Sequence, residues 1–497
     1  MDLFEISDAR PSVDDVPRSV YASLDEIPLV DEQNGTVLFE FSAIEKRGFD
    51  SISRSAKEWQ TKWSERMRGQ QSDLAGPMFA NMQFVNFEIS LPLQNISAKR
   101  WLRAWGNTAS RGNWYEMELV ENAPQYLGKI QVLAYPNLFS GSLTFGLKTA
   151  RKITGSVASG LRAAFNMKTW PSATAVDIRN ALKHADAGVL AVHDIGQGNA
   201  CGLRRSTRSP INLWIDIGCG VNRNAKTTPI NLVLCHSASA PIILTHWDKD
   251  HWSGARKGAP ASKPNIFLKR IWIVPRQEIT TQHSKFADEI IAAHGTILVL
   301  DSTSLGASKI LSVPIRDNRK IEIALGAGAN SKDRNNYQCL VLRIIDDDFK
   351  RKWLLPGDIT YGNMPTGWQK DAYVAIVASH HGADVGAIGL PGPYNLPEGY
   401  AVLAFSFGPQ NAHGPTGVRH PTHAMTAHYN KSGWGLDCWL TAGKSAEAAP
   451  GLFAVSTAQH SPATGMHLGG KLIGWEGAPP TCGSKPPCGS RCTATLG

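Results

Sequence analysis

The sequence predicts an α/β (α+β) protein in which two layered β-sheets are flanked by helices, preceded by an N-terminal domain of unknown fold. From about Gly188 onward, short runs of β-branched and aliphatic residues close with small or acidic residues, as buried strands do. Helical patterns separate only some of these runs, so their order is closer to a pair of layered sheets than to a strict βαβ repeat. Residues 1 to about 185 are instead rich in Trp, Arg and Asn and carry no sharp chemical motif.

In the N-terminal half, residues 51–68 have the spacing of a helix, with Trp59 and Trp63 four residues apart among basic residues. We interpret this segment as an amphipathic surface helix whose tryptophans pack on a core. A nucleic-acid-binding helix with stacking aromatic side chains is the alternative. The tryptophans between residues 101 and 114 lie in a similar setting, and core packing is again the preferred interpretation.

The second half contains the elements that are easiest to predict. A helical pattern runs from His283 to Ala293. We expect strands at Val189–His193, Ile211–Ile217, Pro241–Leu244, Ile271–Val274, Ile321–Leu325, Leu340–Ile345, Trp353–Leu355, Val374–Ala378 and Val402–Phe405.

The chain has 497 residues, and at a typical 100–200 residues per domain it is expected to form about two to four domains. We place an N-terminal Trp-rich domain at 1–185, the main domain at 186–460 and a C-terminal extension at 461–497. The extension ends in a Gly-, Pro-, Ser- and Thr-rich stretch that we expect to be flexible. Its cysteines lack a fourth ligand and the spacing of a zinc knuckle: Cys482, Cys488 and Cys492.

The composition is that of an ordinary globular protein, with 42% hydrophobic and 19% charged residues. A net charge of +9 permits an anionic partner such as nucleic acid without demanding one. Eight cysteines are too few and too scattered for a secreted disulfide scaffold, so we expect reduced thiols. The first five residues are acidic where a signal peptide would be basic, and no apolar run is long enough to span a membrane. We therefore expect a cytoplasmic protein without a membrane partner.

The segment Leu244–Gly254 carries the strongest chemical signal in the sequence. Directly after an apolar strand it places two imidazoles and two carboxylates within six residues, in the order His-x-Asp-x-Asp-His: His246, Asp248, Asp250 and His251. A turn at the end of a strand can point such side chains into one pocket. Histidine and aspartate are also common turn residues, but chance rarely gathers them this way behind a buried strand. The pattern predicts a metal site.

This segment resembles the His-x-His-x-Asp-His signature of the metallo-β-lactamase superfamily, with Asp248 where the second His usually stands. The variant is similar to the metallo-β-lactamase-like domain of the bacterial DNA-uptake channel proteins, the ComEC competence family. Together the matches span about residues 188–430, and the channel part has no counterpart, so we expect a stand-alone soluble member. Further segments resemble motifs of that domain in the same order: Asp194–Ala200, Ile215–Gly218, Leu354–Ile359, Ala378–Ala383 and Ser406–Pro421.

The resemblance implies an αββα metallo-β-lactamase-like sandwich with a metal cleft at one edge of the two sheets. It also implies a hydrolase site for two divalent ions that share one bridging carboxylate. The implied ligands are His246 and Asp248 for one ion, Asp250, His251 and His380 for the other, and Asp358 as the bridge between the two.

Neighbouring residues are expected to support these ligands. Whether His380 or His381 coordinates stays open; we prefer His380 because it comes first after its strand, which leaves His381 to hydrogen-bond a ligand. Asp216 commonly supports the ligand histidines in this superfamily. Asn335 belongs to a segment that resembles the Asn-rich stretch of the subgroup.

Three residues are expected to take part in catalysis: Asp250 and His251, which position the attacking water, and His420. His420 follows the last strand and could act as a general acid or a phosphate contact, while a turn histidine without a role is the alternative. A third histidine found in most relatives is missing here, so one ion has more oxygen ligands. Manganese therefore suits the site as well as zinc, with magnesium as a third candidate.

The leading hypothesis is a two-metal phosphodiesterase, a nuclease acting on DNA. Basic runs at 350–352 and 316–320 give modest support, although such runs are usually solvated. A second hypothesis keeps the metals and changes the substrate to a small ester, thioester, lactone or cyclic nucleotide. A third is an interaction protein in which residues 1–185 bind a protein partner and the metal domain is regulatory.

Overall fold

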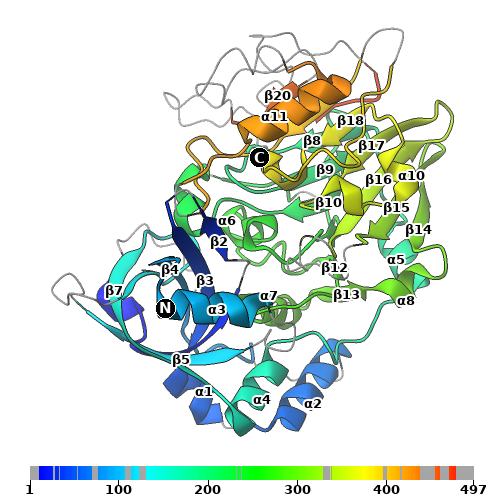
Figure 1. Ribbon diagram of the computed structural model, residues 1–497. Coiled ribbons are helices and arrows are strands. Elements are labelled where there is room, and N and C mark those ends of the chain that lie inside the picture. Colours follow the sequence, from blue (N-terminus) through cyan, green and yellow to red (C-terminus); the bar gives the residue numbers. More distant parts are fainter. Residues whose placement is uncertain are drawn as a thin grey trace. The chain divides into compact units, whose positions relative to one another are not determined.

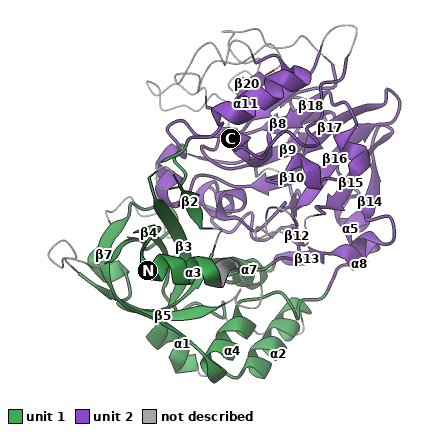
Figure 2. Cartoon of the chain, viewed as in Figure 1, with its two compact units in different colours: residues 1–171, 278–294, 412–418 green, residues 172–277, 295–411, 419–497 purple. Residues whose placement is uncertain are grey.

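The computed structural model divides the chain into two compact units (Figure 1, Figure 2). Unit 1 comprises residues 1–171, 278–294 and 412–418, and unit 2 comprises residues 172–277, 295–411 and 419–497. No helix of the described part is both long and apolar enough to cross a membrane. The structure describes residues 11–25, 28–32, 34–52, 54–69, 77–106, 113–121, 130–230, 232–236, 238–327, 336, 338–395, 400–414, 417–436, 454–458 and 470–476.

Unit 1 is built around a closed antiparallel β-barrel. Its strands pair in the order β1-β5-β7-β6-β4-β3, and β1 also pairs with β3, which closes the ring and leaves β2 outside it against β3. Closure removes free strand edges. Aromatic side chains such as Phe39, Phe41 and Phe87 fill the barrel core. The elements are η1 (Val13–Asp15), β1 (Ser19–Leu24), β2 (Leu29–Asp31), β3 (Thr36–Glu45), α1 (Lys46–Ile52), α2 (Ala56–Met67), β4 (Phe84–Pro92), α3 (Ile96–Gly106), β5 (Trp114–Val120), β6 (Ile130–Tyr135), β7 (Leu143–Lys152), α4 (Gly155–Ala164) and α7 (Thr281–Ala292).

Helix α2 confirms the predicted helix and its core-packing interpretation. Trp59 and Trp63 are fully buried, so neither can stack on a nucleic-acid base. Trp59 stacks on Phe79 with ring centroids 5.7 Å apart, and the Nε1 atom of Trp63 donates to the carbonyl of Ala164 at 2.8 Å. Trp101 is likewise buried in the barrel core.

Unit 2 contains two mixed sheets, ordered β13-β12-β11-β10-β9-β8-β21 and β14-β15-β16-β17-β18-β19-β20. Each joins an antiparallel half to a parallel half, which comprises β10 to β13 in the first sheet and β17 to β20 in the second. The strands are β8 (Val189–Val192), β9 (Ala200–Arg204), β10 (Ile211–Ile217), β11 (Ile242–Ile243), β12 (Ile271–Pro275), β13 (Thr296–Leu300), β14 (Ile310–Ile315), β15 (Arg319–Leu325), β16 (Leu340–Asp346), β17 (Arg351–Leu355), β18 (Ala375–Val377), β19 (Val402–Phe405), β20 (Ala454–Ser456) and β21 (Lys471–Ile473). The helices are α5 (Ala175–Leu182), η4 (Asn222–Thr227), η5 (Lys249–His251), α6 (Gly254–Lys257), α8 (Ser302–Leu305), η6 (Tyr361–Asn363), α10 (Thr366–Gln369), η7 (Ser379–Gly382), α11 (His423–Tyr429) and η8 (Asn430–Trp434).

The two sheets of unit 2 share one hydrophobic core. Leu190 and Ile273 of the first sheet belong to the same buried cluster as Ile321 and Leu342 of the second. The opposite face of the second sheet packs against α11 through residues such as Tyr429. This arrangement is mixed α/β with a layered pair of sheets, as expected. The complete αββα sandwich, with helices on both outer faces, stays a prediction.

Every strand predicted in the second half is present, with ends that differ by one or two residues. The predicted runs did not include β9, β13, β14, β20 or β21. For β9 the reason is its sequence, Ala-Cys-Gly-Leu-Arg, which has no β-branched residue. It is buried because Gly202 leaves room for Ile211, whose Cδ1 atom would lie 2.4 Å from an added Cβ atom.

The boundaries of the units differ from the predicted ranges. Helix α5 lies before residue 185, yet Ile178 and Leu182 of this helix belong to the core of unit 2. Residues 278–294, inside the predicted main domain, belong to unit 1. The functional assignments of the three ranges stay predictions, and the cysteines of the C-terminal tail lie outside the described residues.

Candidate metal centre

The predicted ligands follow strands of both sheets of unit 2. His246 and Asp248 come after β11, Asp358 comes after β17, and His380 and His381 come after β18. Strand β11 is parallel to β10, and β17, β18 and β19 are parallel to one another. Because the carboxyl ends of parallel strands meet at one edge of a sheet, each sheet brings its polar side chains together there.

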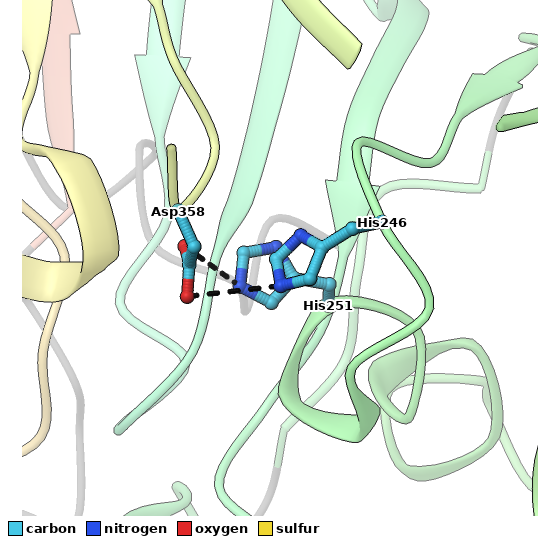
Figure 3. A group of neighbouring side chains, drawn as sticks. All are labelled: His246, His251 and Asp358. Atoms are coloured by element: carbon cyan, nitrogen blue, oxygen red, sulfur yellow. Dashed lines mark ion pairs between the residues drawn. The ribbon is translucent and has the colours of Figure 1, made fainter. Parts of the chain in front are cut away.

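His246, His251 and Asp358 converge in the arrangement drawn in Figure 3. The Nε2 atom of His251 lies 3.2 Å from Oδ1 of Asp358, and Nε2 of His246 lies 3.7 Å from Oδ2 of the same carboxylate. Oδ2 of Asp248 lies 3.2 Å from Nε2 of His246. One carboxylate therefore faces an imidazole with each of its oxygens, and the bridging role of Asp358 stays a prediction.

Asp250, His251 and His381 form a second group. Nε2 of His381 lies 3.2 Å from Oδ2 of Asp250 and 3.9 Å from Oδ2 of Asp358. In each of the two groups the potential ligand atoms lie within 4.8 Å of one another, and His251 belongs to both. The described part of the chain thus places two adjacent sets of metal-ligating atoms around Asp358.

His380 and His381 have different environments. Nδ1 of His381 lies 2.9 Å from the carbonyl oxygen of Ser406, and its side chain is 3% exposed. His380 is 32% exposed, and its Nε2 atom lies 3.6 Å from Oδ2 of Asp358. A ligand histidine usually donates its second N–H to a fixed acceptor, which orients the free nitrogen toward the metal. His381 has that environment, whereas the sequence analysis preferred His380.

Asp216, at the end of β10, holds the ligand segment in place. Its Oδ2 atom lies 2.8 Å from Nδ1 of His251, and its carboxylate accepts bonds from the backbone N–H of Thr245 at 2.7 Å and from the side-chain amide of Asn199 at 2.9 Å. Its φ of 57° is unusual for a residue other than glycine. The arrangement matches the supporting role that the resemblance implies for Asp216.

Thr245 and Asn199 were not predicted as site residues. The hydroxyl of Thr245 donates to Oδ2 of Asp216 at 2.8 Å and lies 3.1 Å from Nδ1 of His246. Thr245 could have been predicted as a site residue from its position directly before His246. Asn199 lies in the matched segment Asp194–Ala200, and its side-chain amide donates to Asp216.

Two glycines of the matched motifs allow close approaches that shape the centre. A Cβ atom on Gly218 would lie 1.6 Å from the carbonyl oxygen of Asp250, so only glycine lets β10 touch that turn. Gly357 has a φ of +59°, and a Cβ atom there would lie 2.9 Å from Thr245. These contacts bring the loop of Asp358 close to the His246 segment.

The charges of the centre depend on one another. Burial raises the pKa of Asp358, but the imidazoles of His251, His380 and His246 lower it more, so this pKa lies well below its ordinary value. For His251 both effects have the opposite sign. Burial lowers the pKa of its imidazole, but the carboxylates of Asp358 and Asp216 raise this pKa well above its ordinary value. Because an imidazole must lose its proton to bind a metal, metal binding and protonation compete at this centre.

His420 lies beside His380, with ring centroids 5.5 Å apart. Its backbone is fixed by Asn411, whose side-chain oxygen accepts from the His420 N–H at 2.8 Å and whose amide donates to the His420 carbonyl at 2.7 Å. The catalytic role of His420 stays a prediction. Asn335 lies outside the described residues.

The donor set fits divalent ions. The Nε2 atoms of His246, His251 and His381 are buried, and within the part of the chain that the structure describes they make no hydrogen bond of normal geometry. Buried polar atoms without partners are rare and costly in folded proteins, and metal ions are among the groups that complete them. Two imidazoles with carboxylate oxygens also form a ligand set that zinc and manganese both accept.

Comparisons with known proteins add little to this geometry. No family model matches the sequence, and no curated protein is significantly similar to it. Among solved structures, the chain is similar to the crystal structure of a new diphosphatase from the PhnP family, with a TM-score of 0.23 and 12% identity over 38% of this chain and 72% of that one. A TM-score this low does not separate a shared fold from a local likeness. The resemblance to the competence proteins is not supported by these comparisons.

Proposed function

We propose that the protein is a two-metal phosphodiesterase of the metallo-β-lactamase type that hydrolyses DNA. The observation that carries the proposal is the convergence of three buried imidazole nitrogens on the carboxylates of Asp250 and Asp358. DNA as the substrate is supported by the ordered motifs that resemble the competence proteins.

The protein's own residues would hold the ions and orient the substrate. His246, Asp248 and Asp358 would bind one ion, and Asp250, His251, His381 and Asp358 the other. Two such ions, when bound, neutralise a phosphodiester and make a water molecule nucleophilic near neutral pH. His380 and His420 lie outside both groups and would contact the phosphate.

The surface charge of unit 2 bears on the choice between DNA and a small phosphoester. The basic runs that supported DNA are largely neutralised by carboxylates. Arg351 lies 2.7 Å from Glu476, and Lys320 lies 2.9 Å from Asp347. A small phosphoester or diphosphate is therefore the second candidate, because a compact site needs no extended basic surface.

A substrate panel tests both candidates. Chelator-treated protein receives Mn²⁺, Zn²⁺ or Mg²⁺ and is assayed on linear and circular DNA, single-stranded DNA, RNA, and small phosphodiesters and esters. We expect DNA cleavage that requires added metal and is at least as fast with manganese as with zinc, because oxygen ligands suit the harder ion. Cleavage of small esters alone would replace DNA with the second candidate, and DNA cleavage that survives chelation would contradict the metal mechanism.

A further inference from the structure

Helix α3 of unit 1 has two opposite faces. Ala98 and Trp101 are fully buried in the barrel core, which fixes the helix to the barrel. Lys99, Arg100 and Arg103 are exposed. At about 100° per residue these three cations occupy an arc of roughly 100° on the side opposite Trp101. The helix therefore presents a basic face on a rigid support.

Strand β7 extends this basic face. Arg100 reaches the strand, since its Nη2 atom lies 3.5 Å from the carbonyl oxygen of Ala150. Lys152, at the end of β7, is exposed. We call Lys99, Arg100, Arg103 and Lys152 the α3–β7 surface.

The acidic residues near the α3–β7 surface are already paired. From residue 90 to residue 171 they are Glu116, Glu118 and Glu121. Glu116 pairs with Lys46 and with Arg151, Glu118 with Lys148 at 3.1 Å, and Glu121 with Arg18. The four cations of the surface make no ion pair with any carboxylate of the described residues.

Helix stabilisation does not account for this pattern. Cations favour the last turn of a helix, which covers Arg103. Lys99 and Arg100 lie in the middle of α3, and Lys152 lies on a strand. In the basic runs of unit 2, by contrast, most cations have a carboxylate beside them, as Lys320 and Arg351 do.

We propose that the α3–β7 surface binds the phosphate backbone of DNA without reading its sequence. Lysine and arginine side chains on a rigid face neutralise backbone phosphates and release counterions, which makes binding strongly salt-dependent. The inference shares with the proposed function the premise that DNA is the substrate. Binding at this surface, however, needs no metal and lies in unit 1, so it can be tested separately from cleavage.

The test measures DNA binding by the full chain after chelator treatment, by fluorescence anisotropy with duplex and single-stranded oligonucleotides across a salt series. The triple variant Lys99→Ala, Arg100→Ala, Arg103→Ala should bind duplex DNA about tenfold or more weakly, and its log–log salt slope should be shallower by about three. A matched control removes three exposed lysines of unit 2 instead: Lys263→Ala, Lys269→Ala, Lys370→Ala. Its salt slope should equal that of the wild type.

Circular dichroism and thermal melting confirm that the variants remain folded, and Lys152→Ala serves as a milder second variant with a slope change of about one. Equal binding by the triple variant and the wild type would overturn the inference, as would an equal loss in the control variant. Preference for an acidic protein or acidic vesicles over DNA would also overturn it. If binding behaves as expected and no DNA is cleaved with any metal, the docking surface stands and the proposed nuclease activity falls.

Discussion

The two units of this protein bury charged side chains in different ways. In unit 1, the buried guanidinium of Arg66 pairs with the buried carboxylate of Asp288, and the backbone N–H of Phe79 donates to the same carboxylate at 3.3 Å. In unit 2, His246, His251 and His381 direct buried nitrogens toward the carboxylates of Asp250 and Asp358. The first cluster is one cation–anion pair, whereas the second gathers several imidazole and carboxylate ligand atoms that could hold a metal ion.

This difference separates a structural charge cluster from a functional one. Burial alone does not identify a site, because both clusters are buried. What distinguishes the centre of unit 2 is that several donor atoms point at one another while their other ring nitrogens are held by Asp216 or by a backbone carbonyl. The same kind of substitution should therefore affect metal binding and turnover in unit 2 but only stability in unit 1.

The largest effect is expected for Asp358→Ala. Loss of the shared carboxylate leaves two cations facing each other without the ligand between them, so both ions should be lost or disordered and turnover should fall by at least about a thousandfold. Metal analysis and the substrate panel measure this. Asp346→Ala is the matched control, because Asp346 is buried in the same unit but pairs with Arg319 at 3.3 Å. Two full metal equivalents in Asp358→Ala would rule out the bridging role.

The next comparison uses two neighbouring histidines as each other's control. His381→Ala should lower the metal content by about one equivalent and turnover by about a hundredfold or more, since it removes a buried ligand. His380→Ala should keep both ions and change mainly the KM for substrate. Metal analysis of the two variants decides between them, and loss of an ion in His380→Ala alone would restore the assignment made from the sequence.

A smaller effect is expected for Asp216→Asn. Asparagine tolerates the left-handed backbone of this position, so the fold should persist, but it offers one acceptor oxygen where His251, Thr245 and Asn199 now use two. Metal affinity should fall by about 10- to 100-fold. Asp186→Asn, at another buried aspartate of unit 2, should leave metal affinity unchanged. An Asp216→Asn protein with wild-type affinity would contradict the orienting role.

The smallest effect on metal binding and turnover is expected for the Arg66–Asp288 pair of unit 1, where pH should change the stability of the fold instead. Burial raises the pKa of Asp288 to about 7, more than Arg66 and the N–H of Phe79 lower it. Between about pH 4 and pH 7 the folded protein then holds a proton that the unfolded chain has lost. The free energy of unfolding should therefore fall by up to about 1.4 kcal/mol for each pH unit of increase in this window.

Urea unfolding of the metal-free protein at several pH values measures this dependence. Asp288→Asn removes the titrating group, so the free energy of unfolding of this variant should depend less on pH. In Asp346→Asn the pH dependence should be that of the wild type. Parallel pH profiles of the wild type and Asp288→Asn would show that Asp288 is ionised throughout and that the pair with Arg66 outweighs its burial.

How far the sequence could predict this protein depends on how local each feature is. The ligands of the His246 segment could be found because they lie within six residues after a strand. Which of His380 and His381 is the ligand could not be predicted from the sequence. Both residues have left-handed backbones, with φ of 48° and 54°, so their order along the chain does not tell which side chain points toward Asp358. The environment of His381 depends on Ser406, which lies 25 residues further along the chain.

The barrel of unit 1 could not be predicted from the sequence. Its strands pair over long stretches of sequence, as β1 does with β5, and closure depends on the additional pairing of β1 with β3. Buried tryptophans such as Trp59 and Trp101 identified a core but not its architecture. The lack of a sharp motif therefore reflected a fold set by long-range pairing, not a lack of structure.

The division of unit 1 into separate chain segments has a consequence for how the protein folds during synthesis. Domains generally fold from the N-terminus as they leave the ribosome. Here Arg66 finds its buried partner only 222 residues later, at Asp288, and residues 412–418 also belong to unit 1. The surroundings of Arg66 on α2 are therefore completed only after strands β8 to β12 of unit 2 have been made. Unit 1 begins first, but it cannot be complete before a large part of unit 2 exists.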